Sequence, residues 1–384
     1  MKQILVGIAV MLILPNACSL RPERIRIGIA LSEPSVDGIR LAARDINADG
    51  GIGGIPLELV GLDWKVQFDA VEILKWASRF AHTQDLVAVI GHSDSASTLC
   101  AAALYNQEQV PQIVTIATNP AITNIGKWTY RLCPSDTVQG PALAEYAVND
   151  WGKKRIALFY VNDDYGRALA SLFEKHAREI GGDIVASITY HNVLDSHDQE
   201  LIRSTLKRMK NEGETDLIAL FQRAGPANWT IRAIREAGIS SAILAGDSLA
   251  LPLFMETDPP LKEGIRIAHF FAPDPDDRRA AEFVRKFKAY TGKDPDYGSA
   301  FAYDALYLVR YAVLHGGYSR RGVKSSLDHL ISDGTQVKGV AGSYALGADH
   351  DARRALYVAE VHNGHGLLLK TLRLSSAQSA GQCP

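Results

Sequence analysis

Short apolar runs alternate with amphipathic segments along this chain, and that alternation constrains its fold more than any other feature. A short apolar run predicts a buried strand, and apolar residues three or four apart predict a helix. The series runs up to residue 135 and begins again after it. Strands and helices in alternation favour parallel sheets covered by helices. We therefore expect an α/β fold of two doubly wound, Rossmann-like lobes of similar design.

The individual elements follow from these runs. Strands are expected at 25–31, 57–62, 86–90, 112–116, 155–161, 183–190, 216–221, 242–245, 264–270, 355–361 and 367–372. Helices are expected at 37–46, 68–80, 99–104, 138–150, 165–180, 198–211, 227–237, 278–290, 299–315 and 321–331. The Gly-rich run 47–54 follows a helix and precedes a strand, so it predicts a turn rather than a dinucleotide-binding loop.

Length and charge limit the class of protein. A chain of 384 residues is too long for one compact core and suits two domains. Apolar residues make up 47% and charged residues 22%, as in ordinary soluble globular proteins. The net charge is −2 with both signs interspersed, which argues against nucleic acid as a partner.

The first 18 residues have the pattern of a secretory signal. An apolar stretch over 4–14 follows a basic start, and a short exit over 15–17 precedes Cys18. Cys18 resembles the processing site of a bacterial lipoprotein, where the cysteine takes a lipid; the alternative is ordinary cleavage near residue 20. No later stretch is apolar for long enough to span a membrane. We expect a periplasmic or otherwise extracytoplasmic protein with a loose polar tail over 375–384.

The sequence has four cysteines, at positions 18, 100, 133 and 383. If Cys18 carries a lipid, Cys100 and Cys133 are the pair that an oxidising compartment would join in a disulfide. The alternative is that both are buried free thiols.

Polar residues follow the strand 86–90 at a point where ligands bind in open α/β sheets. Gly91 ends the strand, and small, mostly polar residues fill 93–98 before an Ala-rich helix. The first N–H groups of a helix and its positive dipole end attract an anion, and serine hydroxyls add donors. The stretch therefore predicts an anion-binding turn. Thr118 follows the next strand and adds a second source of hydroxyls at the same sheet edge.

With these segments in place, the chain resembles the leucine/isoleucine/valine-binding protein family, the type I periplasmic binding proteins of ABC importers. Nine short motifs in the right order carry the resemblance over nearly the whole chain after the signal. They are Asp45–Ile52, Ile90–Thr98, Val110-Pro111, Ala117–Pro120, Arg131 with Pro134–Asp136, Gln139-Gly140, Asp164–Gly166, Glu263-Gly264 and Ala302–Ala305.

The resemblance implies a clamp of two lobes joined by a three-strand hinge, with a ligand closed between them. It implies an N-lobe over 24–135 and 272–346, and a C-lobe over 136–271 and 347–374. It also implies an ABC permease as partner, a monomeric binding protein, and no catalytic residue, cofactor or metal.

The resemblance also implies a binding site, position by position. Ser95 matches the serine that holds the α-carboxylate of an amino acid, and Thr118 matches a threonine that donates from its backbone and hydroxyl. The carbonyl near Ile116 and Ala117 would face the α-ammonium group. Asp247 falls where the family has an acidic residue that pairs with that group. A zwitterion in a site that excludes water needs these two sets of partners.

The second lobe adds Tyr165, which matches a tyrosine that closes on the ligand. Two positions depart from the family pattern. The loop 32–36 is shorter and lacks an aromatic residue, and Arg223 stands near a position where relatives often carry a tyrosine. Arg223 would meet an acidic side chain or a second carboxylate of the ligand; the alternative is a solvated or salt-bridged arginine.

Other chemistry competes with binding. Residues 91–95 resemble the nucleophile elbow of α/β-hydrolases, with Ser93 as nucleophile and with Asp247 and His362 as its partners. Position 95 lacks the glycine of that turn, no oxyanion segment lies upstream, and a second lobe begins after it. His362 and His365 lack further ligands at metal spacing, so we expect an exposed hairpin tip there.

We therefore expect a solute-binding protein, not an enzyme, that captures a branched-chain or related amino acid and delivers it to an ABC permease. The alternatives are an amide, urea or an aromatic acid as ligand, and a periplasmic sensor built on the same clamp.

Overall fold

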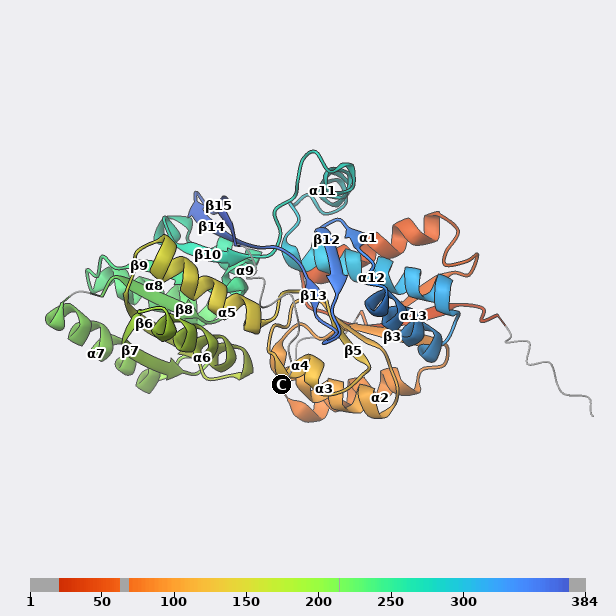
Figure 1. The fold of residues 1–384 in the computed structure, drawn as a ribbon, viewed down its shortest axis with the longest axis horizontal. Coiled ribbons are helices and arrows are strands. Elements are labelled where there is room, and N and C mark those ends of the chain that lie inside the picture. Colours follow the sequence, from red (N-terminus) through yellow and green to blue (C-terminus); the bar gives the residue numbers. More distant parts are fainter. Residues whose placement is uncertain (1–20, 63–68, 214, 373–384) are drawn as a thin grey trace, which may run out of the picture.

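The computed structural model describes residues 21–62, 69–213 and 215–372, which form two lobes joined by crossing segments (Figure 1). The two-lobed α/β fold is confirmed. The predicted signal, Cys18 and the tail over 375–384 lie outside the described residues. Among the helices that the structure describes, none combines the length and the apolar character that a membrane crossing needs.

The first lobe is built on a parallel sheet of five strands in the order β2-β1-β3-β4-β5. Its strands are β1 (Ile25–Ala30), β2 (Leu57–Val60), β3 (Leu86–Gly91), β4 (Gln112–Val114) and β5 (Thr129–Arg131). Its early helices are α1 (Ser35–Ala48), α2 (Ala70–His82), α3 (Ser95–Gln107) and α4 (Ala121–Asn124). Every residue of β3 is buried: Val89 packs with Phe80 and Tyr105, and Ile90 joins the larger core cluster. Apolar residues therefore fill the strand without alternation, as sheets covered on both faces require.

The second lobe has a mixed sheet of seven strands in the order β15-β14-β10-β9-β8-β6-β7. They are β6 (Arg155–Val161), β7 (Asp183–Tyr190), β8 (Leu217–Phe221), β9 (Ala242–Ala245), β10 (Arg266–His269), β14 (Leu356–His362) and β15 (His365–Leu372). β6 to β10 are parallel, and the hairpin of β14 and β15 is antiparallel to β10. The helices are α5 (Asp136–Glu145), the π-helical η1 (Tyr146–Asp150), α6 (Asp164–Glu179), α7 (Ser196–Glu212), α8 (Ala224–Glu236), the 3-10 turn η2 (Asp247–Ala250), α9 (Pro252–Met255) and α10 (Pro259–Lys262).

After β10 the chain returns to the first lobe (Figure 1). The returning elements are α11 (Arg278–Thr291), α12 (Tyr297–Gly316), α13 (Arg320–Ser332), β11 (Val337–Gly339), β12 (Gly342–Leu346) and β13 (Ala352–Arg353). Helix α12 packs against α1. Gly38 lies at this contact, and a Cβ atom there would fall 2.0 Å from the carbonyl oxygen of Ser299. The two helices approach closely because position 38 has no side chain.

A buried ion pair joins two of the three segments that cross from one lobe to the other. Arg131 ends β5, just before the first crossing, and Asp351 lies just before the third. The guanidinium donates from Nε to Oδ1 at 2.8 Å and from Nη2 to Oδ2 at 2.7 Å. We propose that the lobes divide as the sequence predicts except at the last boundary, which we place near residue 353 rather than residue 346 because β13 pairs with β12.

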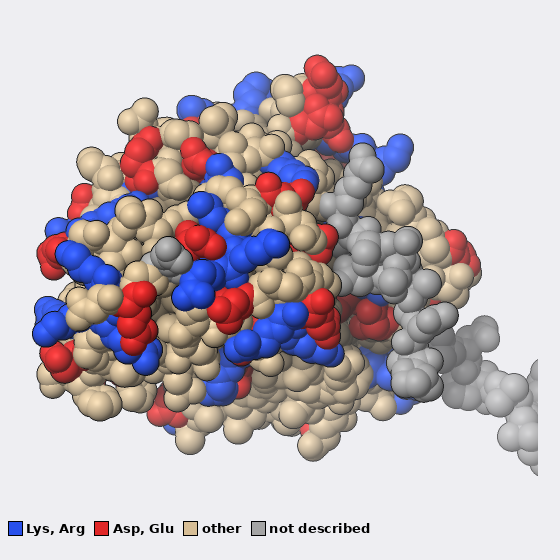
Figure 2. Space-filling view, turned by 60° about the vertical axis from the view of Figure 1, so that its left-hand side comes forward, with Lys and Arg blue, Asp and Glu red and all other residues tan. Residues whose placement is uncertain are grey.

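Charge is mixed over the face that Figure 2 brings forward. Lys and Arg side chains lie among Asp and Glu side chains there, and no broad region of one sign stands out (Figure 2). The charge of this face is therefore balanced locally.

Several elements agree with the sequence to the residue, among them the strands 155–161, 183–190 and 242–245. The helix expected at 99–104 begins earlier, at Ser95, because the Asp94 carboxylate accepts the N–H of Ser97 at 2.9 Å and so caps it. β5 and the strands β11 to β13 were not predicted, because these short segments mix polar and apolar residues and lack a continuous apolar run like that of β9.

Replacing Gly38 by Ala should destabilise the first lobe. The new methyl group would force α1 away from the α12 backbone, at a cost of roughly 1–3 kcal/mol, measured by urea unfolding. Gly225→Ala in α8 is the matched control, since a Cβ atom there meets nothing within 4 Å. Equal stability of the two variants would contradict the close approach.

Candidate ligand-binding site between the lobes

The first lobe presents the start of α3 at the exit of β3. Asp94 accepts hydrogen bonds from the N–H and the hydroxyl of Ser97, so the helix begins at Ser95. Ser95 is buried, and its Oγ accepts the N–H of Asn119 at 3.4 Å. This bond ties the turn after β3 to the turn after β4, which brings the two hydroxyl-bearing loops together.

A buried arginine shapes the second of these loops. Arg131 donates from Nη1 to the carbonyl oxygens of Asn119 at 2.7 Å and Ala117 at 3.4 Å. The loop carries Thr118, whose hydroxyl is buried and has no hydrogen bond of ordinary geometry. A buried hydroxyl without a hydrogen bond destabilises the folded protein unless a ligand or a water molecule pairs with it.

The second lobe contributes an acidic group at the exit of β9. Asp247 is 2% exposed. Its Oδ1 accepts from Gln139 Nε2 at 2.9 Å and from the Tyr165 hydroxyl at 3.1 Å. Its Oδ2 accepts from the Tyr297 hydroxyl at 3.2 Å. Oδ2 therefore keeps acceptor capacity for one further donor.

A second buried carboxyl lies next to this group. Gln139 Nε2 also donates to Asp136 Oδ1 at 3.1 Å, so one amide bridges two aspartates. Burial, and then the charge of Asp247, raise the pKa of Asp136 to about 8. Burial also raises the pKa of Asp247, against the lowering effect of its hydrogen bonds to Gln139, Tyr165 and Tyr297. At neutral pH the pair therefore holds less than its full negative charge.

All of the predicted ligand-binding residues line one small cavity between the lobes, of about 40 Å³. They are Ser95, Ile116, Ala117, Thr118, Tyr165, Arg223 and Asp247, joined by Ser93, Asp94, Ser248, Leu251 and Tyr297. The sequence interpretation missed Tyr297, the first residue of α12 and far from the other residues in the chain. Gln139 belongs to the Gln139-Gly140 motif, but the sequence interpretation assigned it no role in the site.

Arg223 fits both of the interpretations that the sequence left open. It lines the cavity, and it also forms an ion pair with Asp163 at 3.2 Å. Its guanidinium carbon lies 5.9 Å from the centre of the Tyr165 ring. Arg223 is thus held at the edge of the cavity with its charge already partnered.

The residues of the hydrolase alternative are not assembled in the described structure. Ser93 Oγ accepts the N–H of Ser32 at 2.7 Å. The His362 ring lies 2.8 Å from Glu263 and 3.0 Å from Glu360, and it does not line the cavity. His362 and His365 form the closing pair of the β14–β15 hairpin, as expected of a hairpin tip.

Cys100 and Cys133 are free thiols, so the disulfide alternative is not the one found. Cys133 is buried and its sulfur lies 3.4 Å from the carbonyl oxygen of Ala117. Cys100 instead contacts the carbonyl oxygen of Ala70 at 3.9 Å. Each thiol packs against a different part of the lobe, which is why they do not meet.

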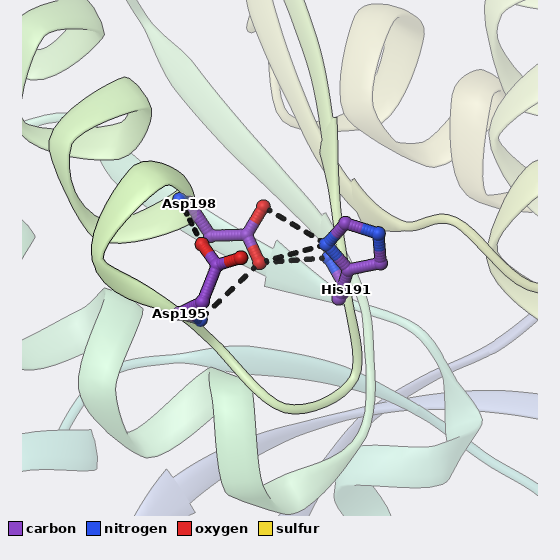
Figure 3. A group of neighbouring side chains, drawn as sticks. All are labelled: His191, Asp195 and Asp198. Atoms are coloured by element: carbon purple, nitrogen blue, oxygen red, sulfur yellow. Dashed lines mark hydrogen bonds and ion pairs between the residues drawn. The ribbon is translucent and has the colours of Figure 1, made fainter.

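One group of potential metal ligands, His191, Asp195 and Asp198, lies at the start of α7 (Figure 3). Asp195 accepts the N–H of Asp198 at 2.8 Å, and Asp198 accepts the N–H of Asp195 at 3.4 Å, which is a capping box. The hydrogen bond from the Asp198 N–H lowers the pKa of Asp195. Helix capping accounts for the two aspartates, and Nδ1 of His191 lies 3.0 Å from Oδ2 of Asp198.

With this geometry established, the chain can be compared with known proteins. Residues 28–366 match the family model described as periplasmic binding protein. The chain belongs to the periplasmic binding protein family. Membership implies a location outside the cytoplasm. It also confirms the resemblance to the leucine/isoleucine/valine-binding type.

Two relatives illustrate the similarity of this periplasmic binding protein in sequence. An amino acid binding protein of Pseudomonas aeruginosa is 28% identical over 278 residues, 70% of each chain. The Leu/Ile/Val-binding protein homolog 1 of Brucella suis is 27% identical over 317 residues, 76% of this chain and 78% of the relative.

Solved structures extend the comparison to the whole fold. An ABC transporter substrate-binding protein from Desulfitobacterium hafniense, solved with Leu, is 26% identical with a TM-score of 0.77, over 90% of this chain and 100% of that one. A leucine-binding protein from Thermotoga maritima has a TM-score of 0.81 at 24% identity, over 91% and 98% of the two chains, which shows the shared fold.

The buried carboxyl pair gives a pH-dependent prediction. Because the folded pKa of Asp136 lies far above its unfolded value, folding takes up a proton, and the stability from this group is lost as the pH rises through about 8. Asp136→Asn is neutral at every pH. As the pH rises from about 4 to about 9, its free energy of unfolding in urea should therefore rise relative to that of the parent by on the order of 1 kcal/mol or more. If the free energies of unfolding of the parent and of Asp136→Asn depended on pH in the same way, the raised pKa of Asp136 would be contradicted.

Proposed function

We propose that this protein captures a branched-chain or related amino acid between its lobes, outside the cytoplasmic membrane, and delivers it to an ABC importer. The observation that carries the proposal is the single cavity in which Ser95 and Thr118 of one lobe face Asp247 and Tyr165 of the other. One side offers donors and the other a carboxylate, as the two ends of a zwitterion require.

The carboxylate of the ligand binds to the first lobe. The N–H groups of Ser95 and Ala96 at the start of α3 and the hydroxyl of Ser95 provide donors, and the helix dipole adds a favourable potential. Thr118 donates from its buried hydroxyl, which has no hydrogen bond of ordinary geometry within the described residues. The carboxylate of the ligand therefore meets hydrogen-bond donors that carry no full positive charge.

The ammonium group of the ligand binds to Asp247. Tyr165, Tyr297 and Gln139 hold the carboxylate in place and leave Oδ2 one acceptor position for an N–H of the ligand. The ligand cation also favours the ionised form of the carboxyl, since an opposite charge lowers a carboxyl pKa. Backbone carbonyls near Ile116 complete this end of the site.

Binding requires the lobes to part and close again. A cavity of about 40 Å³ is smaller than an amino acid, so entry needs a wider cleft. In the closed arrangement Asn119 Nδ2 donates across the lobes to the carbonyl oxygen of Asp164 at 2.6 Å. Such closure is a hinge motion, in which short segments absorb the rotation. The process changes no covalent bond, so we infer binding rather than catalysis.

The ligand side chain points toward Leu251 and Arg223, which complete the cavity wall. Leu251 favours an apolar side chain, and Arg223 keeps its charge paired with Asp163. The relatives with Leu or Leu/Ile/Val in their names support a branched-chain ligand. We further propose a monomer, exported by its signal, with Cys18 as the candidate lipid attachment point.

Asp247→Ala should weaken binding of leucine by about 30-fold, or about 2 kcal/mol, because a buried ammonium group loses its partner. Isothermal titration calorimetry measures the effect. Asp294→Ala is the matched control, since Asp294 is exposed, pairs with Lys288 and does not line the interlobe cavity. Unchanged leucine affinity in Asp247→Ala would rule out the proposed ammonium site.

A thermal-shift panel tests the ligand class. Leucine, isoleucine and valine at a hundred times the dissociation constant should each add about 2.7 kcal/mol of stability and raise Tm. Acetamide and urea should leave Tm unchanged, and benzoate should not displace leucine from the site between the lobes. A shift with one of these and none with the amino acids would replace the proposed ligand by that class.

A further inference from the structure

A second cavity, of about 660 Å³, lies in the first lobe away from the site between the lobes. It is bounded by α11, by α12 and by residues 335–340, and it is also lined by Tyr344 of β12 and Leu330 of α13. It shares no lining residue with the interlobe cavity. Its volume falls in the range of pockets that hold small organic molecules.

Aromatic rings from one helix face form a wall of this cavity. Tyr303, Tyr307 and Tyr311 follow one another at intervals of four residues along α12, so they lie on the same face. The rings of Tyr303 and Tyr307 stack at 4.9 Å. Tyr311 is 38% exposed, while Phe283 and Tyr344 are buried deeper in the wall. Tyr311 also stacks on His315 at 3.9 Å, and the guanidinium carbon of Arg310 lies 6.0 Å from the centre of the Tyr307 ring. The cavity therefore offers the edges and the remaining faces of these rings to a planar apolar group.

The charges at this cavity that lack a carboxylate partner are positive. Glu282 pairs with Lys286 at 3.2 Å. Buried Asp304 accepts the N–H groups of Val340 and Ala341 and lies 3.5 Å from Arg354.

The basic side chains of the wall differ in their partners. Lys286 also pairs with Asp45, and Arg279 pairs with Asp277. Arg310 of α12 and Lys338 of β11 have no ion pair within the described residues, and Arg310 Nε is buried without a hydrogen bond. These two cations are left to meet an anion.

We propose that this cavity is a second ligand site, which binds an aromatic monocarboxylate. The ring of the ligand stacks on the tyrosines of α12, and its carboxylate pairs with Arg310 and Lys338. Both requirements must be met together, since a neutral ring gains no ion pair and a small anion gains no stacking. The site is separate from the amino acid site and does not depend on it.

Naphthalene-2-carboxylate is the probe, titrated by calorimetry into the mature protein in the presence of saturating leucine. We expect binding that is weakened about tenfold or more in Lys338→Met and in Arg310→Met. Arg285→Met on α11, which does not line the cavity, is the matched control and should bind as the parent does. The neutral analogue naphthalene-2-carboxamide should bind about tenfold more weakly than the acid.

Leucine affinity and Tm of each variant separate lost binding from lost folding. Lys338 is exposed and unpaired in the described structure, so its variant should keep both values. The proposal is overturned if the probe fails to bind, if it competes with leucine, or if acid and amide bind equally. It is also overturned if only an acidic peptide binds. If leucine itself fails to bind, the proposed function fails, while the effects of Arg310 and Lys338 still decide this proposal.

Discussion

A carboxylate that is buried between two lobes needs hydrogen-bond donors, and Asp247 takes its donors from both of them. Gln139 and Tyr165 come from α5 and α6 of the second lobe, whereas Tyr297 begins α12, which packs in the first lobe. Without these donors a buried charge would be too costly to keep. The position of the acidic group in the cleft therefore depends on both lobes being in place.

The loops of the first lobe depend on a second buried group. Arg131 holds the carbonyls of Ala117 and Asn119 on one side and the carboxylate of Asp351 on the other. One guanidinium thus fixes the loop that carries Thr118 and ties the first crossing to the third. An arginine suits this position because its fork of donors serves several acceptors at once. The shape of the anion-binding side and the start of the hinge rest on the same side chain.

Helix α12 contributes to both the interlobe cavity and the second cavity. Its first residue, Tyr297, donates to Asp247 in the cleft, and its outer face presents Tyr303, Tyr307 and Tyr311 to the second cavity. The sequence indicated this helix over 299–315 from its apolar periodicity alone. Which of its aromatic rings would be buried, and against what, depended on α11 and β11 lying beside it. Single-chain periodicity carries no information on that packing.

The sequence by itself determined the alternation of strands and helices, the two lobes and most of the residues of the cleft, because parallel strands end at one sheet edge and their exits can be read from the chain. Ser95, Thr118 and Asp247 were found in this way or by matching short motifs. Only the tertiary structure decided that Tyr297 joins them, that Asp136 shares Gln139 with Asp247, and that Cys100 and Cys133 stay apart. These facts depend on distances between segments far apart in the chain, and on burial, which no local pattern encodes.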